Sequence, residues 1–515
     1  MKKHKDNRLF KNTSIVTGLS IAERALGFLY RIVLSRFIGA EGMGIYQIAL
    51  SHYFLLHTVG AGGIPASVSR FIARCNAEGK RSEIGKTVGA GLSLSLLFTL
   101  PICLFFIFSR ENIFSDFLDE NVFLLLKILL FSLPFSCLFE VIRASFWGEK
   151  QFLAPALLEA FEEIVTVLLG TILLLIYAGK PDFSIILGAK NATIALTVAY
   201  LFSFICATIY FFVSKRKIDN PRTYLKPLFC AAAPITAVRT GASLINSAVA
   251  VLFPALLVKS GLSYLEAMQS YGVLTGMALP VLFIPITLIS GFSLVLMPEL
   301  SEAFYAKNYQ KLTTNIRRGV GVAILLSCCL IPFFFSLGAD MGGVIYANSL
   351  AGELIANGCF LLLPMSVAMI TTSILNSMGK EKYTFILYFI STGGMLLLMT
   401  AFTPTLKEYA YLVAMLFNFT LTAVCNLLLL TNILKKLTPT EAKSIFDKQT
   451  AASALLGAAI ICLIGKTCSS LLSSVCDKTW TLIFSALLIL ILCVGWYFVF
   501  IFVPRKTTAK KGRRK

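Results

Sequence analysis

Long apolar stretches recur from one end of this 515-residue chain to the other. A membrane-spanning helix needs about 20 mainly apolar residues, and most of these stretches are that long. Hydrophobic residues make up 57% of the chain and charged residues only 14%, and the mean hydropathy is +0.81. Soluble domains carry about 25% charged residues. We therefore predict an all-α polytopic membrane protein.

The hydropathy pattern predicts about fourteen transmembrane helices. The connections between them are too short to form a soluble domain, so any binding site must be built from the helices themselves. The predicted spans are roughly 12–37, 45–72, 84–109, 122–146, 154–178, 184–213, 227–258, 265–298, 314–337, 351–378, 383–402, 408–431, 450–472 and 479–503.

The formal net charge of +20 is unevenly distributed. Most Lys and Arg residues lie at the amino terminus, in alternate loops and in the carboxyl tail, as the positive-inside rule describes. This pattern favours a membrane orientation signal over nucleic-acid binding, and it predicts that both termini are cytoplasmic. The basic tail 504–515 is expected either to contact anionic membrane lipids or only to set the topology.

Two stretches about 230 residues apart resemble each other. They are "LPFSCLFEVIRASFWGEKQ" at 133–151 and "LPMSVAMITTSILNSMGKEKY" at 363–383, and a second pair of segments from 65 and from 298 has a similar offset. Internal repeats are common in transporters. We predict two six-helix lobes, residues 1–218 and 219–440, followed by two additional helices within 441–503.

Glycine and proline interrupt two of the predicted spans. The second span contains Gly60, Gly62, Gly63 and Pro65, and the eighth contains Pro280 and Pro285. Both residue types weaken helices, so these positions are candidate hinges. The alternative is that Gly and Pro are simply more frequent in membrane helices.

Polar residues in the first span recur at steps of three and four, which places them on one helix face. The stripe comprises Thr13, Thr17, Ser20, Arg24, Gly27, Arg31 and Ser35. Arg24 lies roughly 18 Å from a helix start near residue 12, close to the membrane centre. A guanidinium there needs water, a counter-ion or a ligand.

Arg239, in the first helix of the second predicted lobe, occupies a position corresponding to Arg24. Guanidinium groups bind two phosphate oxygens at once and stay charged in a low-dielectric site. Arg24, Arg31 and Arg239 on facing lobes would thus suit a diphosphate. Alternatively, acidic residues pair with these arginines and hold the lobes together.

Three glutamates in the fifth span, Glu159, Glu162 and Glu163, are spaced i, i+3 and i+4. Carboxylates on one face repel, so one of them is expected to be protonated or to hold a cation, which suggests Na⁺ or H⁺ coupling. The alternative is headgroup contact or pairing with arginine. Glu23 is expected to be a pairing residue, and Glu140 and Arg143 a local ion pair.

The thirteen cysteines show no metal-ligand spacing. We predict no metal site and no bound cofactor beyond a coupling ion. Cys468 and Cys476 are a candidate disulfide, because both are expected on the outer face.

Two motifs resemble a known family. "ERALGFLYRIVLSRFIGAEGMGIYQIAL" at 23–50 and "YGVLTGMALPVLFIPITLISGFSLVLMPELSEA" at 271–303 are similar to the first-helix and eighth-helix signatures of the stage V sporulation protein B and MurJ-like branch of the multidrug/oligosaccharidyl-lipid/polysaccharide (MOP) exporter superfamily. The resemblance covers nearly the whole chain. It implies two lobes like those of multidrug exporters of the MATE type, in the bacterial cytoplasmic membrane.

The resemblance also implies a function and site residues. The function is flipping of an undecaprenyl-diphosphate-linked saccharide, most typically lipid II for peptidoglycan or spore cortex, by alternating access of a monomer that works with cell-wall synthesis proteins. Arg24, Arg31 and Arg239 match the family's cavity arginines, and Glu162 matches its fifth-helix acidic residue. Relatives often carry an Arg shortly after that Glu, where this chain has Thr166 or its neighbours.

Other functions are open from the sequence. The chain could export teichoic-acid or capsular precursors, or drugs, as other members of the superfamily do. A membrane glycosyltransferase would need an acidic pair or a catalytic loop at a membrane face, and the short loops offer no convincing one. We therefore predict a transporter with no catalytic residues.

Overall fold

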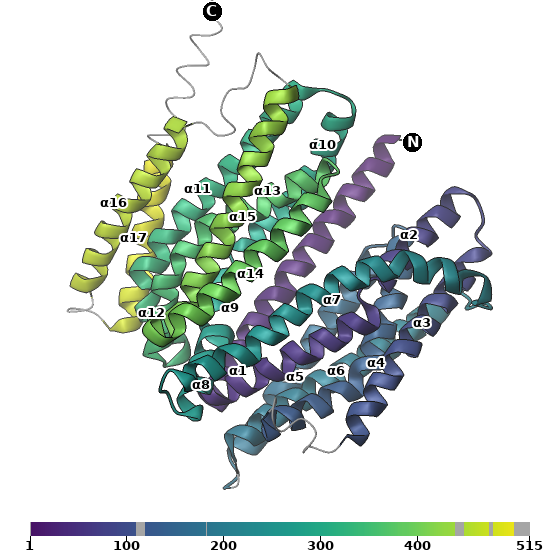
Figure 1. Cartoon of the computed structure of the whole chain (residues 1–515), viewed down its shortest axis with the longest axis horizontal. Coiled ribbons are helices and arrows are strands. Elements are labelled where there is room, and N and C mark those ends of the chain that lie inside the picture. The colour runs from purple at the N-terminus through teal and green to yellow at the C-terminus, as the bar shows by residue number, and fades with distance from the viewer. Residues whose placement is uncertain (1, 110–118, 182, 438–447, 473–476, 499–515) are drawn as a thin grey trace, which may run out of the picture. The chain divides into compact units, whose positions relative to one another are not determined.

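A computed structural model describes residues 2–109, 119–181, 183–437, 448–472 and 477–498, and side chains at 2–14, 17, 294–295, 448–451 and 497 are outside the description. Over these ranges the chain forms helices and no strand (Figure 1). Cys476, the tail 504–515 and the side chains of Thr13 and Thr17 lie outside the described residues. The expectations that involve them stay predictions.

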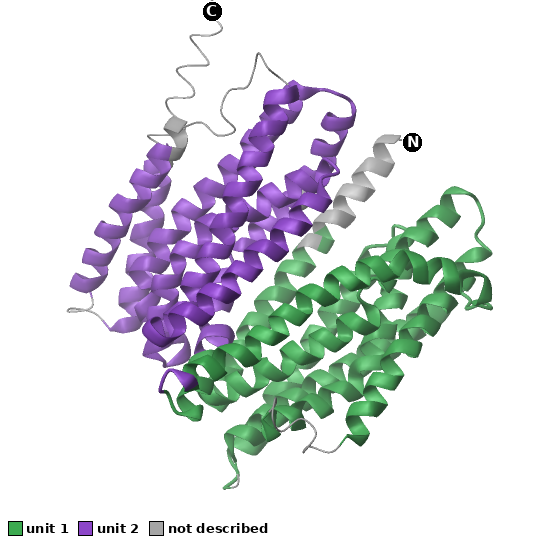
Figure 2. Cartoon of the chain, in the orientation of Figure 1, with its two compact units in different colours: residues 1–258, 262–272 green, residues 259–261, 273–515 purple. Residues whose placement is uncertain are grey.

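The contacts divide the chain into two compact units, residues 1–258 with 262–272 and residues 259–261 with 273–515 (Figure 2). The helices of unit 1 are α1 (Lys2–Ala61), α2 (Ile64–Ala77), α3 (Glu83–Phe108), α4 (Glu120–Gly148), α5 (Leu153–Ala178), α6 (Ile185–Val213), α7 (Arg222–Lys259, whose last residue is assigned to unit 2) and α8 (Tyr264–Gly272).

Unit 2 begins with a short π-helix, η2 (Val273–Ala278). The helices that follow are α9 (Leu279–Phe283), α10 (Ile286–Tyr305), α11 (Tyr309–Met341), η3 (Gly342–Tyr346), α12 (Ser349–Gly358), η4 (Cys359–Leu361), α13 (Leu362–Ser377), α14 (Glu381–Leu406), α15 (Glu408–Leu437), α16 (Lys448–Leu472) and α17 (Lys478–Tyr497).

Among the described residues, 12 helices are long and apolar enough to cross a membrane. They coincide in order with the third to fourteenth predicted spans. The first predicted span falls in α1 and the second in the end of α1 and the start of α2, and neither helix is among the 12. The prediction of an all-α polytopic membrane protein is confirmed, and the count of fourteen is approximate.

The structure corrects the boundaries of the second predicted span, which begins in α1. α1 is interrupted at Gly39, where φ is +63°, a backbone conformation that glycine adopts without the steric cost of a side chain. The next helical stretch ends at Ala61, and α2 starts at Ile64 with Pro65 in its first turn. The predicted span 45–72 is therefore two helices. The break falls at Gly62 and Gly63, because Pro65 provides no N–H for a continuous helix.

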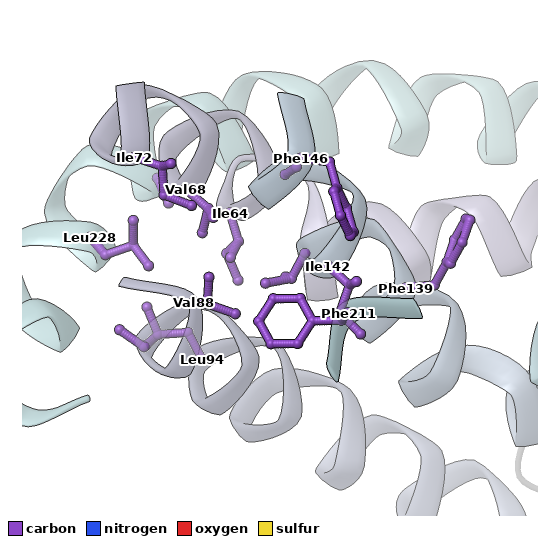
Figure 3. Close-up of a cluster of buried hydrophobic side chains, with 14 of the residues drawn as sticks. Ile64, Val68, Ile72, Val88, Leu94, Phe139, Ile142, Phe146, Phe211 and Leu228 are labelled. Carbon is purple, nitrogen blue, oxygen red and sulfur yellow. The ribbon is translucent and has the colours of Figure 1, made fainter. Parts of the chain in front are cut away.

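The core of unit 1 shows where α7 belongs (Figure 3). Leu228 and Ala232 of α7 are buried in one apolar cluster with residues of α2, α3, α4 and α6, among them Val68, Val88 and Phe146. α8 in turn packs closely on α1, since a Cβ atom added at Gly44 would clash with the carbonyl of Met268. The compact units thus divide between 258 and 273. The division at 218 and 219 remains a prediction about sequence repeats.

The eighth predicted span, 265–298, is not one helix. It comprises α8, η2, α9 and the first part of α10. Pro280 lies in the first turn of α9, and Pro285 is the residue before α10. A proline has no N–H to donate to the preceding turn, which explains why the regular helix stops at these positions. Whether these breaks act as hinges stays a prediction.

Capping side chains set the starts of two core helices in unit 1. The Asp119 carboxylate accepts a hydrogen bond from the backbone N–H of Asn121 at 2.8 Å, and Ser184 accepts one from Leu187 at 3.1 Å. Such caps satisfy N–H groups that the first turn leaves without partners. α4 and α6, which bear much of the apolar core, therefore begin at defined residues.

Candidate functional site

The two first-helix arginines lie in unit 1 with different exposures. Arg24 is exposed and Arg31 is half-buried. No carboxylate of the described residues lies within 4.0 Å of either guanidinium. Seven residues separate the two arginines, so they share one face of α1. The chain therefore carries two cations, on a mainly apolar helix, that no described acidic side chain neutralises by direct contact.

The predicted polar stripe on α1 is covered in part by α5. A Cβ atom at Gly27 would lie 2.6 Å from Oε1 of Glu163, so the Glu163 carboxylate rests directly against the α1 backbone. Ser35, at the other end of the stripe, is buried and donates to the carbonyl of Ile32 at 2.8 Å. Among the described residues of the stripe, from Ser20 to Ser35, Arg24 is the exposed one.

Arg143 of α4 forms ion pairs with two glutamates. It donates to both oxygens of Glu140, at 2.6 and 2.7 Å, and to Glu159 on α5. Its side chain is 17% exposed, and its guanidinium also lies 4.8 Å from the ring of Trp147. The predicted pair between Glu140 and Arg143 is confirmed. Glu159, predicted as a coupling or headgroup residue, is bound to this arginine.

Glu162 and Glu163 differ from Glu159 in having no ion pair with a described residue. Glu162 lies beside Ser203 of α6. Glu163 is near Arg31 and near Glu23 of α1, at distances longer than an ion pair. The carboxylates of Glu23, Glu162 and Glu163 therefore lie in one region with Arg31, and Arg24 and Arg143 also act on this region electrostatically.

Arg239 contacts the predicted hinge. Its Nη1 donates to the carbonyl oxygen of Gly62 at 2.7 Å, and the Gly63 N–H donates to Oγ1 of Thr236 at 3.0 Å. Both bonds satisfy backbone groups that the break between α1 and α2 leaves without helical partners. Arg239 is exposed and keeps other guanidinium N–H groups for a ligand. It lies in the same compact unit as Arg24, because α7 packs in the core of unit 1.

Some polar contacts of this region are not indicated by the sequence. Tyr53 is buried, its hydroxyl lies 2.8 Å from that of Ser136, and its ring stacks on Tyr200. The bond from Arg143 to Glu159 was also missed. Helical spacing relates residues within one helix, so contacts between α4 and α5, or between α1 and α6, have no signal in a single sequence.

A family model described as "Polysaccharide biosynthesis protein" matches residues 9–304, more than half of the chain. The chain belongs to this family.

Two relatives from Bacillus subtilis (strain 168) are similar to most of the chain. Stage V sporulation protein B is 26% identical over 350 residues, which cover 66% of this chain and 67% of that protein. Lipid II flippase MurJ is 24% identical over 421 residues, covering 73% and 74%. The predicted membership of the MOP superfamily is confirmed.

Solved structures show the same fold. Lipid II flippase MurJ in an inward closed conformation matches with a TM-score of 0.71 and 15% identity, covering 94% of this chain and 98% of that one. An inward-facing multidrug resistance MATE family transporter matches with a TM-score of 0.67 and 16% identity, covering 81% and 96%. The protein is a multi-pass membrane transporter and not an enzyme, as the sequence predicted.

Proposed function

We propose that the protein flips an undecaprenyl-diphosphate-linked saccharide, with lipid II as the first candidate, across the bacterial cytoplasmic membrane by alternating access. The observation that carries the proposal is Arg24, an exposed guanidinium without a described ion-pair partner on an apolar helix. A diphosphate supplies the counter-charge that such a residue needs. The similarity to a protein named lipid II flippase supports this substrate class.

The test is transbilayer movement of lipid II in proteoliposomes that contain the purified protein. Wild type should flip lipid II, and Arg24→Ala and Arg31→Ala should reduce the rate by about tenfold or more, because each removes charge-assisted hydrogen bonds. Arg36→Ala, which removes another exposed arginine of the same helix outside the polar stripe, is the matched control. Undiminished flipping by the first two variants would refute the diphosphate role.

The same assay separates the alternative substrates. Wild type that moves a teichoic-acid or capsular precursor but not lipid II would correct the saccharide and keep the diphosphate. Wild type that exports a cationic drug, with Arg24→Ala unaffected, would replace the proposal with drug export.

We also propose that Glu162 and Glu163 are the place where Na⁺ or H⁺ couples to transport. Glu159 is already bound to Arg143, whereas these two carboxylates have no ion pair with a described residue. Flipping should respond to a Na⁺ or pH gradient in wild type. In Glu162→Gln or Glu163→Gln this response should disappear while lipid binding remains. A full gradient response in both variants would exclude them as the coupling residues.

The distribution of basic residues supports an orientation with both termini in the cytoplasm. Reporter fusions at the two ends test it, because cytoplasmic and external reporters give opposite signals. An external signal from either end would overturn this orientation.

A further inference from the structure

Three polar segments of unit 1 meet at the end of α4. They are the end of α2, the turn before α3 and the turn between α4 and α5. Together they line a pocket of about 710 Å³, whose polar walls include Asn76, Arg81, Glu149, Lys150 and Gln151. All three segments lie on the membrane face whose loops are rich in Lys and Arg, predicted to be cytoplasmic.

The α4–α5 turn has a defined geometry. A Cβ atom at Gly148 would lie 2.8 Å from Cβ of Ile72, so the turn packs directly on α2. The N–H groups of Lys150 and Gln151 donate to the last carbonyls of α4, each at 2.9 Å. Lys150 has a φ of +62°, which is unusual for a residue other than glycine. The fold thus places a lysine where glycine is the common choice.

The acidic residue in the pocket wall, Glu149, is neutralised by an arginine of the same unit. Glu149 is ion-paired with Arg216, whose side chain is 10% exposed, and Arg216 also donates to the Gln151 side chain at 3.1 Å. Arg81 and Lys150 are exposed, and no described carboxylate lies within 4.0 Å of their charged groups. The pocket therefore presents two uncompensated positive charges.

More basic residues line an adjoining pocket of about 290 Å³. This second pocket shares Arg81, Ile84 and Glu149 with the first. It adds three basic residues, Lys215, Arg216 and Lys217, and one acidic residue, Asp219. Basic side chains therefore outnumber acidic ones around the two pockets, which favours an anionic ligand over a neutral or cationic one.

An apolar groove starts at the same corner. It has a volume of about 880 Å³, begins at Lys150 and Gln151, and continues along α5 and α6. Its walls include Leu157 and Tyr210, which are 51% and 41% exposed, and the half-buried Cys206. Exposed apolar side chains on membrane-spanning helices are solvated by lipid chains. The groove and the basic pocket share Lys150 and Gln151, so one molecule can occupy both.

We propose that this corner is a binding site for an anionic glycerophospholipid of the adjacent leaflet. Arg81 and Lys150 bind the phosphodiester, the Asn76 amide contributes a hydrogen bond, and the acyl chains lie in the groove along α5 and α6. A free anion would need only the polar pocket, and a neutral lipid only the groove. The continuity of the two favours a ligand with both parts. The proposal does not depend on which lipid the protein flips.

The test is native mass spectrometry of the full-length protein in detergent, titrated with phosphatidylglycerol, with phosphatidylcholine as the neutral lipid and inorganic phosphate as the free anion. Basic residues near a membrane surface each strengthen anionic lipid binding by about fivefold. The double variant Arg81→Gln/Lys150→Gly should therefore bind phosphatidylglycerol about 25-fold more weakly. Glycine at 150 removes the charge and keeps the turn, because it accepts the positive φ.

Two matched controls separate binding from folding. Lys307→Gly changes another lysine with positive φ, in unit 2, and should leave phosphatidylglycerol binding unchanged. Ala154→Phe fills the groove without changing charge and should weaken binding. Leu168→Phe, at an exposed position of α5 outside the groove, should not.

Two outcomes would overturn the proposal. Equal phosphatidylglycerol binding by wild type and the double variant would remove the charge contribution. Displacement of phosphatidylglycerol by inorganic phosphate, together with unchanged binding in Ala154→Phe, would show a free-anion site and not a lipid site.

Discussion

Arg143 and Arg24 both lie in segments of unit 1 that the sequence predicts to span the membrane, yet their surroundings are opposite. Arg143 is mostly buried and bound to Glu140 and Glu159, while Arg24 is exposed and has no ion pair with a described residue. A buried guanidinium with two carboxylates is fully compensated within the protein. An uncompensated one needs a partner from outside, so the comparison separates a structural arginine from one that is free to bind a ligand.

The largest expected effect is on stability in Arg143→Met. Removing this guanidinium leaves Glu140 and Glu159 without their partner. These side chains are partly buried, so the cost should be about 3 kcal/mol, the lower end of the range for a fully buried ion pair. The free energy of unfolding, measured by denaturant titration in detergent, should fall by that amount. Arg24→Met is the matched control and should change it by less than about 0.5 kcal/mol. Similar small changes in both variants would remove the distinction between the two arginines.

The second effect concerns ligand affinity. Arg24→Ala should weaken binding of an undecaprenyl-diphosphate saccharide by about tenfold to a hundredfold, because hydrogen bonds to charged groups contribute about 1.5–3 kcal/mol each. Arg24→Lys keeps the charge but loses the bidentate hydrogen bonding of a guanidinium. Its affinity for the lipid should therefore lie between those of wild type and Arg24→Ala. Titration of the lipid against purified protein measures this. Wild-type affinity in Arg24→Ala would mean that Arg24 does not bind the diphosphate.

The contact between Gly27 and Glu163 predicts a smaller change. Gly18→Ala, where an added methyl group has open space, should gain up to about 1 kcal/mol of helix stability. Gly27→Ala should be about 1 kcal/mol less stable than that variant, because its methyl group displaces the Glu163 carboxylate from its preferred conformation. When each glycine change is made separately in a Glu163→Ala background, the difference in stability between the two variants should vanish. Thermal unfolding measures it. A difference that persists would place the strain elsewhere.

The smallest effect is expected for a paired charge in water. Hydrogen bonds from Lys80 and Arg74 lower the pKa of Glu78, in the exposed turn after α2, to about 2. Because this pKa lies below the ordinary value of 4.5, the stabilisation is complete above pH 4.5 and is lost as the pH falls toward 2. Exposed ion pairs contribute little, so the effect should be slight compared with Arg143.

Melting temperatures of wild type and Glu78→Gln at several pH values and low salt test this. Any advantage of wild type near neutral pH should shrink on acidification. An advantage that grows toward pH 2 would have the wrong sign for a carboxylate with a lowered pKa.

Much of the fold was predictable because membrane solvation acts on each segment separately. A span must satisfy its backbone hydrogen bonds internally and present apolar side chains. For this reason eleven of the fourteen predicted helices match single candidate spans in the structure, and the eighth matches one in part. The positions where regular helices stop were also visible, as Pro65, Pro280 and Pro285 lie at helix starts. The break at Gly39 falls in the connection predicted between the first two spans, 12–37 and 45–72.

The candidate site was only partly predictable. Spacing within one helix revealed that Arg24 and Arg31 share a face and that Glu140 pairs with Arg143. It could not reveal which helices are neighbours. The structure alone shows that Arg143 reaches Glu159 and that Arg239 caps the Gly62 carbonyl.

Hydropathy and helical periodicity are local properties, so they suffice to identify this chain as a bundle of membrane-spanning helices with charged residues inside it. Which of those charges are neutralised within the protein is visible only once the helices are packed. An ion pair between two helices depends on their relative rotation and depth, which packing of the whole unit sets. For that reason Arg143 and Arg24, similar in sequence context, are expected to serve different purposes.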